Sequence, residues 1–421
     1  MKQGFAEGVV ALDRQIDARV ASYFSSCVHC GLCAEACLFY TETGDPRYTP
    51  IYKLEPMRRL WRQRHTFWGR LAASLGWSRP LTEQDFADWE ELLYDSCTMC
   101  GRCSMVCPVG NDMAYMIRRQ REGFSTAGYA PPGMQAATRR TLELGSPMGV
   151  SLKTLQAAVR HVEEHTHLTI PLDRQGADYM VLFSSMEVVN FPEFIESIAL
   201  IFDAADVSWT VSSHAFEATN SGIQIGNSEA AREIVNRVVE AAEALQVKYV
   251  ISPECGHAYT AIRWEGPNLI GRPYRFQVLH ILELLDQLQR EGRLQLEGHS
   301  DIPMSFHDPC QLVRRGGVIE QPRDLLRAAA GHFVEMTDHA EMNWCCGGGG
   351  GVSANERANE LRLQAFKRKK SQLDELGIET LVTACANCRI VLEEGLEAYQ
   401  MDIEVIGLTE LVAACLEQEK G

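Results

Sequence analysis

The cysteines of this chain are the feature that most restricts its fold, because thirteen of the fifteen fall into two dense groups. Eight lie in the range 27–107 and five in the range 310–388. The first residues carry no apolar run behind a basic stretch, so we expect no secretory signal and a reducing, cytoplasmic setting. In such a compartment, closely spaced cysteines indicate metal sites and not disulfides.

Length, composition and charge restrict the class of protein and its partners. A chain of 421 residues predicts two or three packed units, and 46% hydrophobic with 23% charged residues excludes a disordered or collagen-like protein. The net charge of −16 repels phosphate backbones, so we expect no nucleic-acid partner. Since about 18 consecutive apolar residues occur nowhere, any membrane role is expected to come through a partner or a surface contact.

The first group of cysteines repeats one spacing, C-x2-C-x2-C-x3-C, at 27–37 and at 97–107. In this spacing, three neighbouring thiolates bind one iron–sulfur cubane and the fourth reaches the other cubane. Four-cysteine zinc sites are the alternative, but they usually consist of two separated pairs. Pro108 follows the last cysteine of the second motif, whereas Leu38 takes the corresponding place in the first. The predicted ligands of one [4Fe–4S] cluster are Cys27, Cys30, Cys33 and Cys107, and those of the other are Cys97, Cys100, Cys103 and Cys37.

The segment between these two motifs is the only strongly basic one. From Pro56 to Pro80 it holds six arginines and no acid. Leu60, Phe67, Leu71 and Leu75 lie near helical spacing there, with three tryptophans interleaved. One interpretation is a helix that covers the cluster domain with its arginine stems on apolar surface. The other is a docking surface for a membrane subunit or for anionic lipid.

The remaining chain predicts an α/β architecture. The expected fold is a helical ferredoxin-type domain with two [4Fe–4S] clusters at 1–125, followed by a helical linker at 126–176 with turns at 131–133 and 145–147. Short β-rich runs then alternate with long amphipathic helices, which is typical of a largely parallel sheet. This pattern occurs twice, so we expect a pseudo-duplicated α/β domain with one half at 177–300 and the other at 301–421.

The two halves align by the order of their elements. The predicted strands of the first half are 179–183, 207–211 and 248–251, with a helix at 229–245; those of the second are 304–306, 332–336 and 379–382, with a helix at 355–376. Each half closes on a similar segment, 278–284 in the first and 405–411 in the second.

The second group of cysteines follows these strands. Because the carboxyl ends of parallel strands meet along one edge of a sheet, we expect thiols far apart in sequence to converge there. Gly347 to Gly351 lets the backbone approach closely, and the helix expected from Asn355 directs its positive end toward the same place. Five thiols exceed the four that a cubane or a structural zinc needs, which favours an unusual cluster. The thiols are Cys310, Cys345, Cys346, Cys385 and Cys388.

The sequences His307-Asp308-Pro309-Cys310, Cys345-Cys346-Gly347 and Cys385-Ala386-Asn387-Cys388 resemble the cysteine-rich CCG domain of heterodisulfide reductases. With the two cluster motifs ahead of it, nearly the whole chain is similar to the D-type subunit of these enzymes and to the K subunit of Dsr complexes and its Hmc and Tmc relatives. This resemblance implies two cubanes and a special CCG-bound [4Fe–4S] cluster that cleaves a disulfide or trisulfide. It also implies a membrane cytochrome b-type electron donor.

The first half departs from that family pattern. Met186 and the segment 216–220 stand where an intact first half has cysteines, and only Cys255 survives. We therefore expect one special cluster. Cys255 is open to three interpretations: a buried core residue, a cluster ligand and a thiol that contacts substrate. Cys415, on an apolar helix, is expected in the core.

Four residues besides the cysteines have predicted roles. His257 is a candidate proton donor, because cleaving a disulfide takes two electrons and two protons; a structural histidine is the alternative. His307 and Asp308 are expected to orient the ligand loop through hydrogen bonds. Glu217 is expected to serve the same site from the first half, on the resemblance alone.

The function that follows is that of a thiol:disulfide oxidoreductase acting within a complex, cytoplasmic and peripheral at the inner membrane face through a partner. Electrons would pass through the two cubanes to the CCG cluster, which reduces or reversibly oxidises a small or protein-borne disulfide. Two alternatives remain: a pure electron-transfer module, and an iron–sulfur subunit of a 2-hydroxy acid oxidase.

Overall fold

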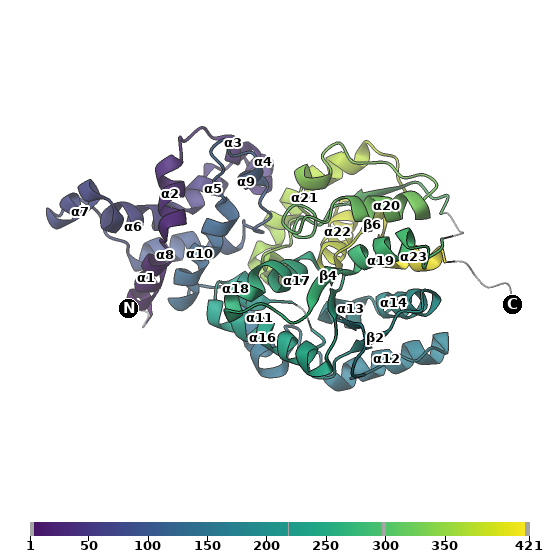
Figure 1. The fold of residues 1–421 in the computed structure, drawn as a ribbon. Helices are drawn as coiled ribbons and strands as arrows, with labels where there is room; N and C mark the ends of the chain where they lie inside the picture. Colours follow the sequence, from purple (N-terminus) through teal and green to yellow (C-terminus); the bar gives the residue numbers. More distant parts are fainter. Residues whose placement is uncertain (1–3, 218, 297–299, 417–421) are drawn as a thin grey trace. The chain divides into compact units, whose positions relative to one another are not determined.

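The computed structural model describes residues 4–217, 219–296 and 300–416, so that Ala218 lies outside the described residues. The chain divides into two compact units (Figure 1). Across the described ranges, no helix is both long and apolar enough to cross a membrane. The first unit comprises Met1–Ala136, Ser221–Glu229 and Gly347–Arg368, and the second comprises Ala137–Asn220, Ala230–Cys346 and Lys369–Gly421.

The first unit is helical, as predicted for its N-terminal part, and its most extensive helix pair is α1 with α10. Their backbones approach closely because both helices carry glycine at the crossing. A Cβ at Gly8 would lie 2.4 Å from the Cβ of Ala127, and one at Gly123 would lie 2.5 Å from the Cβ of Leu12. The helices of this unit are α1 (Phe5–Arg14), α2 (Ala18–Ser26), α3 (Leu32–Glu35), α4 (Leu38–Thr43), α5 (Pro50–Lys53), α6 (Glu55–His65), α7 (Phe67–Ser74), α8 (Glu83–Tyr94), α9 (Arg102–Met105), α10 (Met113–Thr126) and α15 (Ser221–Ile225).

The two cysteine motifs form loops with the same backbone. His29 and Met99 have positive φ angles of 54° and 53°, and Gly31 and Gly101 follow with 84° and 80°. The left-handed conformation suits glycine and is uncommon for other residues. After it, the short helices α3 and α9 begin, and each carries the third cysteine of its motif. The repeated spacing in the sequence is therefore a repeated loop in the structure.

The second unit contains two parallel sheets. The first has the strand order β2-β1-β3-β4 and the second β5-β6-β7. The strands β5 and β6 are buried along their whole length, as expected of parallel sheets covered on both faces. The strands are β1 (Tyr179–Val181), β2 (Trp209–Val211), β3 (Tyr249–Ser252), β4 (Gln277–His280), β5 (Met304–His307), β6 (Thr380–Thr383) and β7 (Glu404–Gly407). The α/β character and the parallel pairing are thus confirmed.

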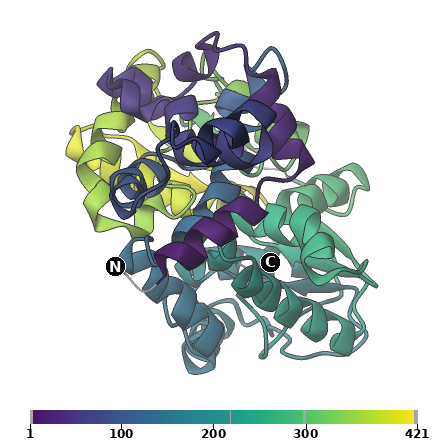
Figure 2. The same ribbon diagram turned by 90° about the vertical axis from the view of Figure 1, so that its left-hand side faces the viewer.

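One hydrophobic core runs through this unit and joins both sheets, with Val181, Ile251, Phe306 and Val382 among its buried members. Helix α14, which follows the strand β1, packs against α23 after β7. Figure 2 shows the teal and green helices in a second view. The other helices, of which α11, α16 and α21 begin in the first unit, are α11 (Pro132–Leu144), α12 (Leu152–Thr166), α13 (Ser185–Asn190), α14 (Glu193–Ala204), α16 (Ser228–Leu245), α17 (Gly256–Thr260), α18 (Gly266–Ile270), α19 (Ile281–Arg290), α20 (Glu320–Ala329), α21 (Asn359–Asp374), α22 (Ala386–Ala398) and α23 (Leu408–Ala414).

Two expected elements differ from the sequence prediction. The strand at 332–336 is reduced to a single parallel bridge between Phe333 and Met304, because its backbone bonds to β5 only through Met304, which donates to His332 and accepts from Val334. The helix expected from Asn355 begins at Asn359, after two 3₁₀ turns. There the Asn355 amide and the neighbouring Arg357 guanidinium both donate to the Asp95 carboxylate, which fixes the turn.

Candidate metal centres

Four cysteines of the first unit line one cavity, and they come from both motifs. Cys27, Cys30 and Cys33 of the first motif meet Cys107 of the second there, with Ile51 and Met113 completing an apolar wall. This is the set of four that the spacing predicts for one cluster.

The other four line a second cavity. Cys37 of the first motif lies there with Cys97, Cys100 and Cys103 of the second. Unlike the first cavity, this one has a lysine in its wall, Lys53 of α5. Its Nζ lies 3.8 Å from Cys37 Sγ and donates a hydrogen bond to the carbonyl of Ser96 at 2.5 Å.

The chemistry of these thiols fits a cationic metal cluster. Burial raises the pKa of Cys33 to about 11, and the neighbouring thiols of Cys27 and Cys107 add to the shift. Burial likewise raises the pKa of Cys103 well above its usual value. Thiolates that are buried together disfavour one another's ionised form unless positive charge lies between them. Thiolate ligation of iron supplies that charge, so the residues present suit a cubane in each cavity.

The five remaining motif cysteines converge in the second unit. Cys310 Sγ and Cys345 Sγ lie 3.8 Å apart, although 34 residues separate them in sequence. Cys346 Sγ and Cys388 Sγ lie 3.3 Å apart. All of these thiols are buried, and Cys385 is close enough to Cys388 for a hydrogen bond that lowers the pKa of Cys385. The predicted convergence at the carboxyl ends of β5 and β6 is therefore present.

A histidine lies in the same cluster. The ring of His307 has a nitrogen that lies, together with the sulfurs of Cys346 and Cys388, in a group whose ligand atoms are all within 4.8 Å of one another. Both its ring nitrogens are buried and lack a hydrogen-bond partner among the described residues. Burial lowers the pKa of His307 well below its usual value, which makes the ring a neutral potential ligand or hydrogen-bond donor. The role predicted for His307, hydrogen bonding of the ligand loop, is accordingly wrong for the ring.

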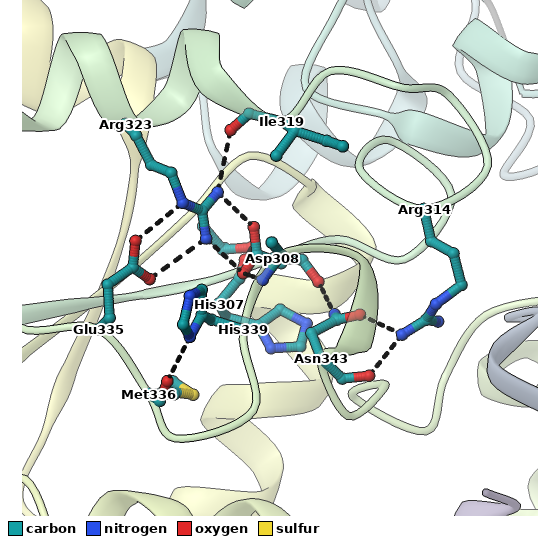
Figure 3. Close-up of polar contacts among 11 residues, drawn as sticks. His307, Asp308, Arg314, Ile319, Arg323, Glu335, Met336, His339 and Asn343 are labelled. Atoms are coloured by element: carbon teal, nitrogen blue, oxygen red, sulfur yellow. Dashed lines mark hydrogen bonds and ion pairs between the residues drawn. The ribbon is translucent and has the colours of Figure 1, made fainter. Parts of the chain in front are cut away.

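Asp308, by contrast, organises the loop as predicted (Figure 3). Its two carboxylate oxygens accept hydrogen bonds from Arg323 at 2.9 and 3.0 Å, and one also accepts from the backbone N–H of Ala340 at 2.7 Å. The Asn343 amide donates to the Asp308 carbonyl and is itself held by Arg314. This network connects the segment before Cys310 with the segment before Cys345.

A buried lysine supplies positive charge to the site, and sequence reasoning missed it because no motif marks it. Lys369 lies on α21, is 1% exposed, and donates to Gln372 at 2.9 Å. Burial lowers its pKa to about 8, while the charges of Asp308 and Cys346 oppose that shift. Anionic thiolates in a low-dielectric interior are stabilised by such a cation.

Cys255 follows β3 as Cys385 follows β6, and each is the residue before a helix, α17 and α22 respectively. Burial raises the pKa of Cys255, and the neighbouring Cys385 thiol contributes to the shift. The backbone N–H of Gly256 donates a hydrogen bond to Cys385, and the N–H of Ala386 donates to the carbonyl of Glu254 at 2.9 Å. The two strand ends are therefore joined directly.

The remaining residues singled out in the sequence are His257, Glu217 and Cys415. His257 Nε2 is 3.3 Å from the backbone oxygen of Asn220. Glu217 accepts hydrogen bonds from Ser185 and, at 2.8 Å, from the N–H of Thr219; burial raises its pKa. Cys415 belongs to the hydrophobic core, which confirms the expectation for that residue.

Two protein-family descriptions match this chain. The family described as 4Fe-4S dicluster domain matches residues 23–111, and the cysteine-rich CCG domain matches residues 304–393. An Hdr-like menaquinol oxidoreductase iron-sulfur subunit of Archaeoglobus profundus is 25% identical over 94% of this chain and 79% of its own. The D subunit of the dihydromethanophenazine:CoB–CoM heterodisulfide reductase of Methanosarcina acetivorans is 26% identical over 93% of each chain. An EtfAB:quinone oxidoreductase of Syntrophomonas wolfei is 26% identical over 90% of this chain and 56% of its own.

Proposed function

We propose that this chain, an iron–sulfur protein of the heterodisulfide reductase D-subunit type with a 4Fe-4S dicluster domain and a CCG domain, is the catalytic subunit of its complex. In this proposal it carries electrons to the CCG cysteines and there reduces, or in reverse oxidises, a disulfide or trisulfide. The observation that carries the proposal is the gathering of five buried thiols and His307 from sequence-distant strand ends.

The residues have distinct tasks in this proposal. The eight N-terminal cysteines would hold two cubanes, and Cys310, Cys345, Cys346, Cys385 and Cys388 would hold the special cluster. Iron–sulfur clusters, when bound, supply one-electron transfer. Reducing a disulfide consumes two electrons and two protons and releases two thiols. Two one-electron transfers are therefore required for each turnover.

Polar side chains of the chain would contact the substrate, hold protons and balance the charge of the thiolates. The ring of His307 lies beside Cys346 and Cys388 and is suited to hydrogen-bond a substrate sulfur or to bind iron. His257 and Cys255 are the candidates on the other strand end for holding a proton or contacting substrate. Lys369 would offset the negative charge of the thiolates, and the Asp308–Arg323 pair would hold their loop in place.

Two features support an origin by internal duplication. The first sheet has the order β2-β1-β3-β4, and the bridge at Phe333 extends the second to the same order of positions. Each half also ends with a strand that runs directly into a helix, at His280 and at Gly407. We infer that 177–300 is a degenerate CCG half and 301–421 the intact one, behind a ferredoxin-type domain at 1–125 and a linker at 126–176.

The electron donor is proposed to be a membrane cytochrome b-type subunit. The names of the Archaeoglobus and Methanosarcina relatives include menaquinol and dihydromethanophenazine, which supports a lipid-soluble donor here as well. The chain would then work in the cytoplasm, peripherally at the inner membrane face.

Electron paramagnetic resonance of the oxidised, reconstituted full chain tests this function. We expect a signal that changes when a thiol is added, that is absent from Cys346→Ala, and that persists in Cys415→Ala, whose sulfur lies in the hydrophobic core. With a reduced dye as electron source, the wild-type chain should turn over disulfides. No signal from the oxidised chain with or without thiol, and only the signals of two ordinary cubanes after reduction, would contradict the proposal.

The name of the Syntrophomonas relative favours a second candidate, because it describes electron transfer to quinone and no disulfide chemistry. In that case the CCG cysteines would only pass electrons to a partner. The dye assay separates the two, since a pure electron-transfer module would show a reducible CCG cluster and no turnover with any disulfide.

A further inference from the structure

Helix α7 exposes its apolar side chains to solvent. None of its residues is buried, whereas the preceding helix α6 buries Met57 and Leu60. The exposed fractions of Trp68 and Trp77 are 75% and 79%, values at which an indole ring contributes nothing to a core. We use the name α7 surface for Phe67, Trp68, Leu71, Leu75 and Trp77 together with the exposed arginines Arg62 and Arg70.

The α7 surface is built on a defined scaffold. Thr66 caps α7 by accepting a hydrogen bond from the N–H of Gly69 at 3.1 Å, and its hydroxyl donates to the carbonyl of Arg62 at 2.7 Å. A Cβ on Gly69 would lie 1.7 Å from that same carbonyl oxygen, so only glycine permits this close turn from α6 to α7. The side-chain amide of Gln63 on α6 donates a hydrogen bond to the carbonyl of Arg79, which holds the end of the basic segment against α6. In Figure 1, α7 lies at the outer end of the helical unit, beyond α6.

The charge around α7 is positive, unlike that of the rest of the chain. Residues 56–80 hold six arginines and no acid, in a chain of net charge −16. Four of the arginines have carboxylate partners, as in the ion pairs of Arg59 with Asp85 and Arg64 with Asp13. Arg62 and Arg70 have no ion pair among the described residues and flank the exposed aromatic rings.

We propose that the α7 surface inserts into the headgroup region of an anionic lipid bilayer. A short helix with tryptophan, phenylalanine and leucine on a basic background is what lies in the plane of such an interface. The anionic leaflet attracts this one basic segment and repels the remaining acidic surface, which would set the orientation of the chain. None of these apolar side chains lines a cavity at the metal centres, and the two arginines without an ion pair match the charge of anionic headgroups.

Vesicle sedimentation with the full reconstituted chain tests this proposal, without any substrate or electron donor. We expect at least about tenfold stronger binding to phosphatidylcholine vesicles that contain phosphatidylglycerol than to phosphatidylcholine alone, and weaker binding as salt is raised. Two variants should each lose most of that preference: Trp68→Ser/Leu71→Ser/Trp77→Ser, and Arg62→Gln/Arg70→Gln. Matched controls elsewhere on the surface, Trp264→Ser and Arg160→Gln/Arg232→Gln, should bind as the wild type does.

Circular dichroism and iron content identify any variant that fails to fold. Equal binding to both kinds of vesicle would overturn the proposal, and so would equal losses in the α7 variants and the controls. Sedimentation only with membranes that contain a partner subunit would also overturn it, in favour of a protein partner. Because the readout is lipid binding, failure here leaves the disulfide chemistry untouched, and failure of that chemistry leaves the lipid contact standing.

Discussion

The ammonium group of Lys53 lies 3.8 Å from the sulfur of Cys37 at the wall of one cysteine cavity. Lys53 is 2% exposed, and its Nζ is 5.6 Å from the ring centre of Phe39 and 5.9 Å from that of Tyr48. Among the described residues that line the other cavity there is no lysine or arginine. The two proposed cubanes therefore have different electrostatic surroundings.

This difference predicts a difference in reduction potential. A nearby cation stabilises the more negative, reduced form of a cluster, and hydrogen bonds to its sulfurs act in the same direction. We expect Lys53→Met to lower the potential of the cluster on Cys37, Cys97, Cys100 and Cys103 by on the order of 60 mV, which is a tenfold change for one electron. Potentiometric titration followed by electron paramagnetic resonance measures it.

Two further variants separate charge from packing. Lys53→Arg keeps the charge and should largely restore the potential, whereas Arg58→Met removes a positive charge whose partner is Glu55 and should leave both potentials unchanged. If Lys53→Met shifted both clusters equally, or neither, the role assigned to this lysine would be wrong.

The pair of Asp308 and Arg323 predicts a strong effect on stability. Both side chains are buried, and the guanidinium binds the carboxylate through two hydrogen bonds. Removing one partner of a buried ion pair leaves the other charge uncompensated, at a cost of about 3–5 kcal/mol. We expect Arg323→Leu to lower the free energy of unfolding of the second unit by about this amount, measured by urea denaturation.

The neighbouring Arg327 on the same helix serves as the control for that substitution. It is exposed and pairs with Asp324, so Arg327→Leu should change the free energy of unfolding by less than about 1 kcal/mol. Similar losses in the two variants would mean that the effect comes from α20 itself and not from the contact with Asp308.

Acid sensitivity is expected from His280. Burial lowers the pKa of its ring to about 3, while one ring nitrogen accepts a hydrogen bond from the N–H of Leu282. Well above pH 6.5 the ring is neutral in both the folded and the unfolded chain and has no effect. As the pH falls below 6.5, only the unfolded chain binds the proton, so stability falls, by about 2 kcal/mol between pH 7.5 and pH 5. His280→Asn keeps a capping side chain and should flatten this part of the profile; parallel profiles for both proteins would refute the assignment.

Much of this architecture could be predicted because it depends on local sequence. Equal spacing in two cysteine motifs produces equal loops, down to the left-handed conformation of His29 and Met99. The alternation of β-rich runs and helices likewise predicts a parallel sheet, whose geometry brings Cys310 and Cys388 to one edge whatever the loops between them do.

What could not be predicted depends on contacts between distant segments. Nothing around Lys369 in sequence indicates that it lies beside the thiols, because its neighbours form an ordinary charged helix. The same holds for the ring of His307, whose sequence position gives no direction for its nitrogens. Spacing also cannot distinguish a covering helix from an exposed one, and the basic segment contains both: α6 packs on the unit and α7 does not.

The two halves of the second unit pack backbone to backbone at Gly256. A Cβ at this position would lie 2.4 Å from the backbone nitrogen of Leu312, two residues after Cys310, and backbone atoms cannot move aside as a side chain can. Its N–H also donates to Cys385. We therefore expect Gly256→Ala to destabilise the second unit by about 1–3 kcal/mol and to remove about a third of the bound iron, that of the CCG cluster.

Gly331→Ala is the matched control, because its nearest neighbour is the movable carboxylate of Asp301 at 3.2 Å; it should keep its iron. Full iron content in Gly256→Ala would show that Cys310 and Cys385 do not depend on this contact.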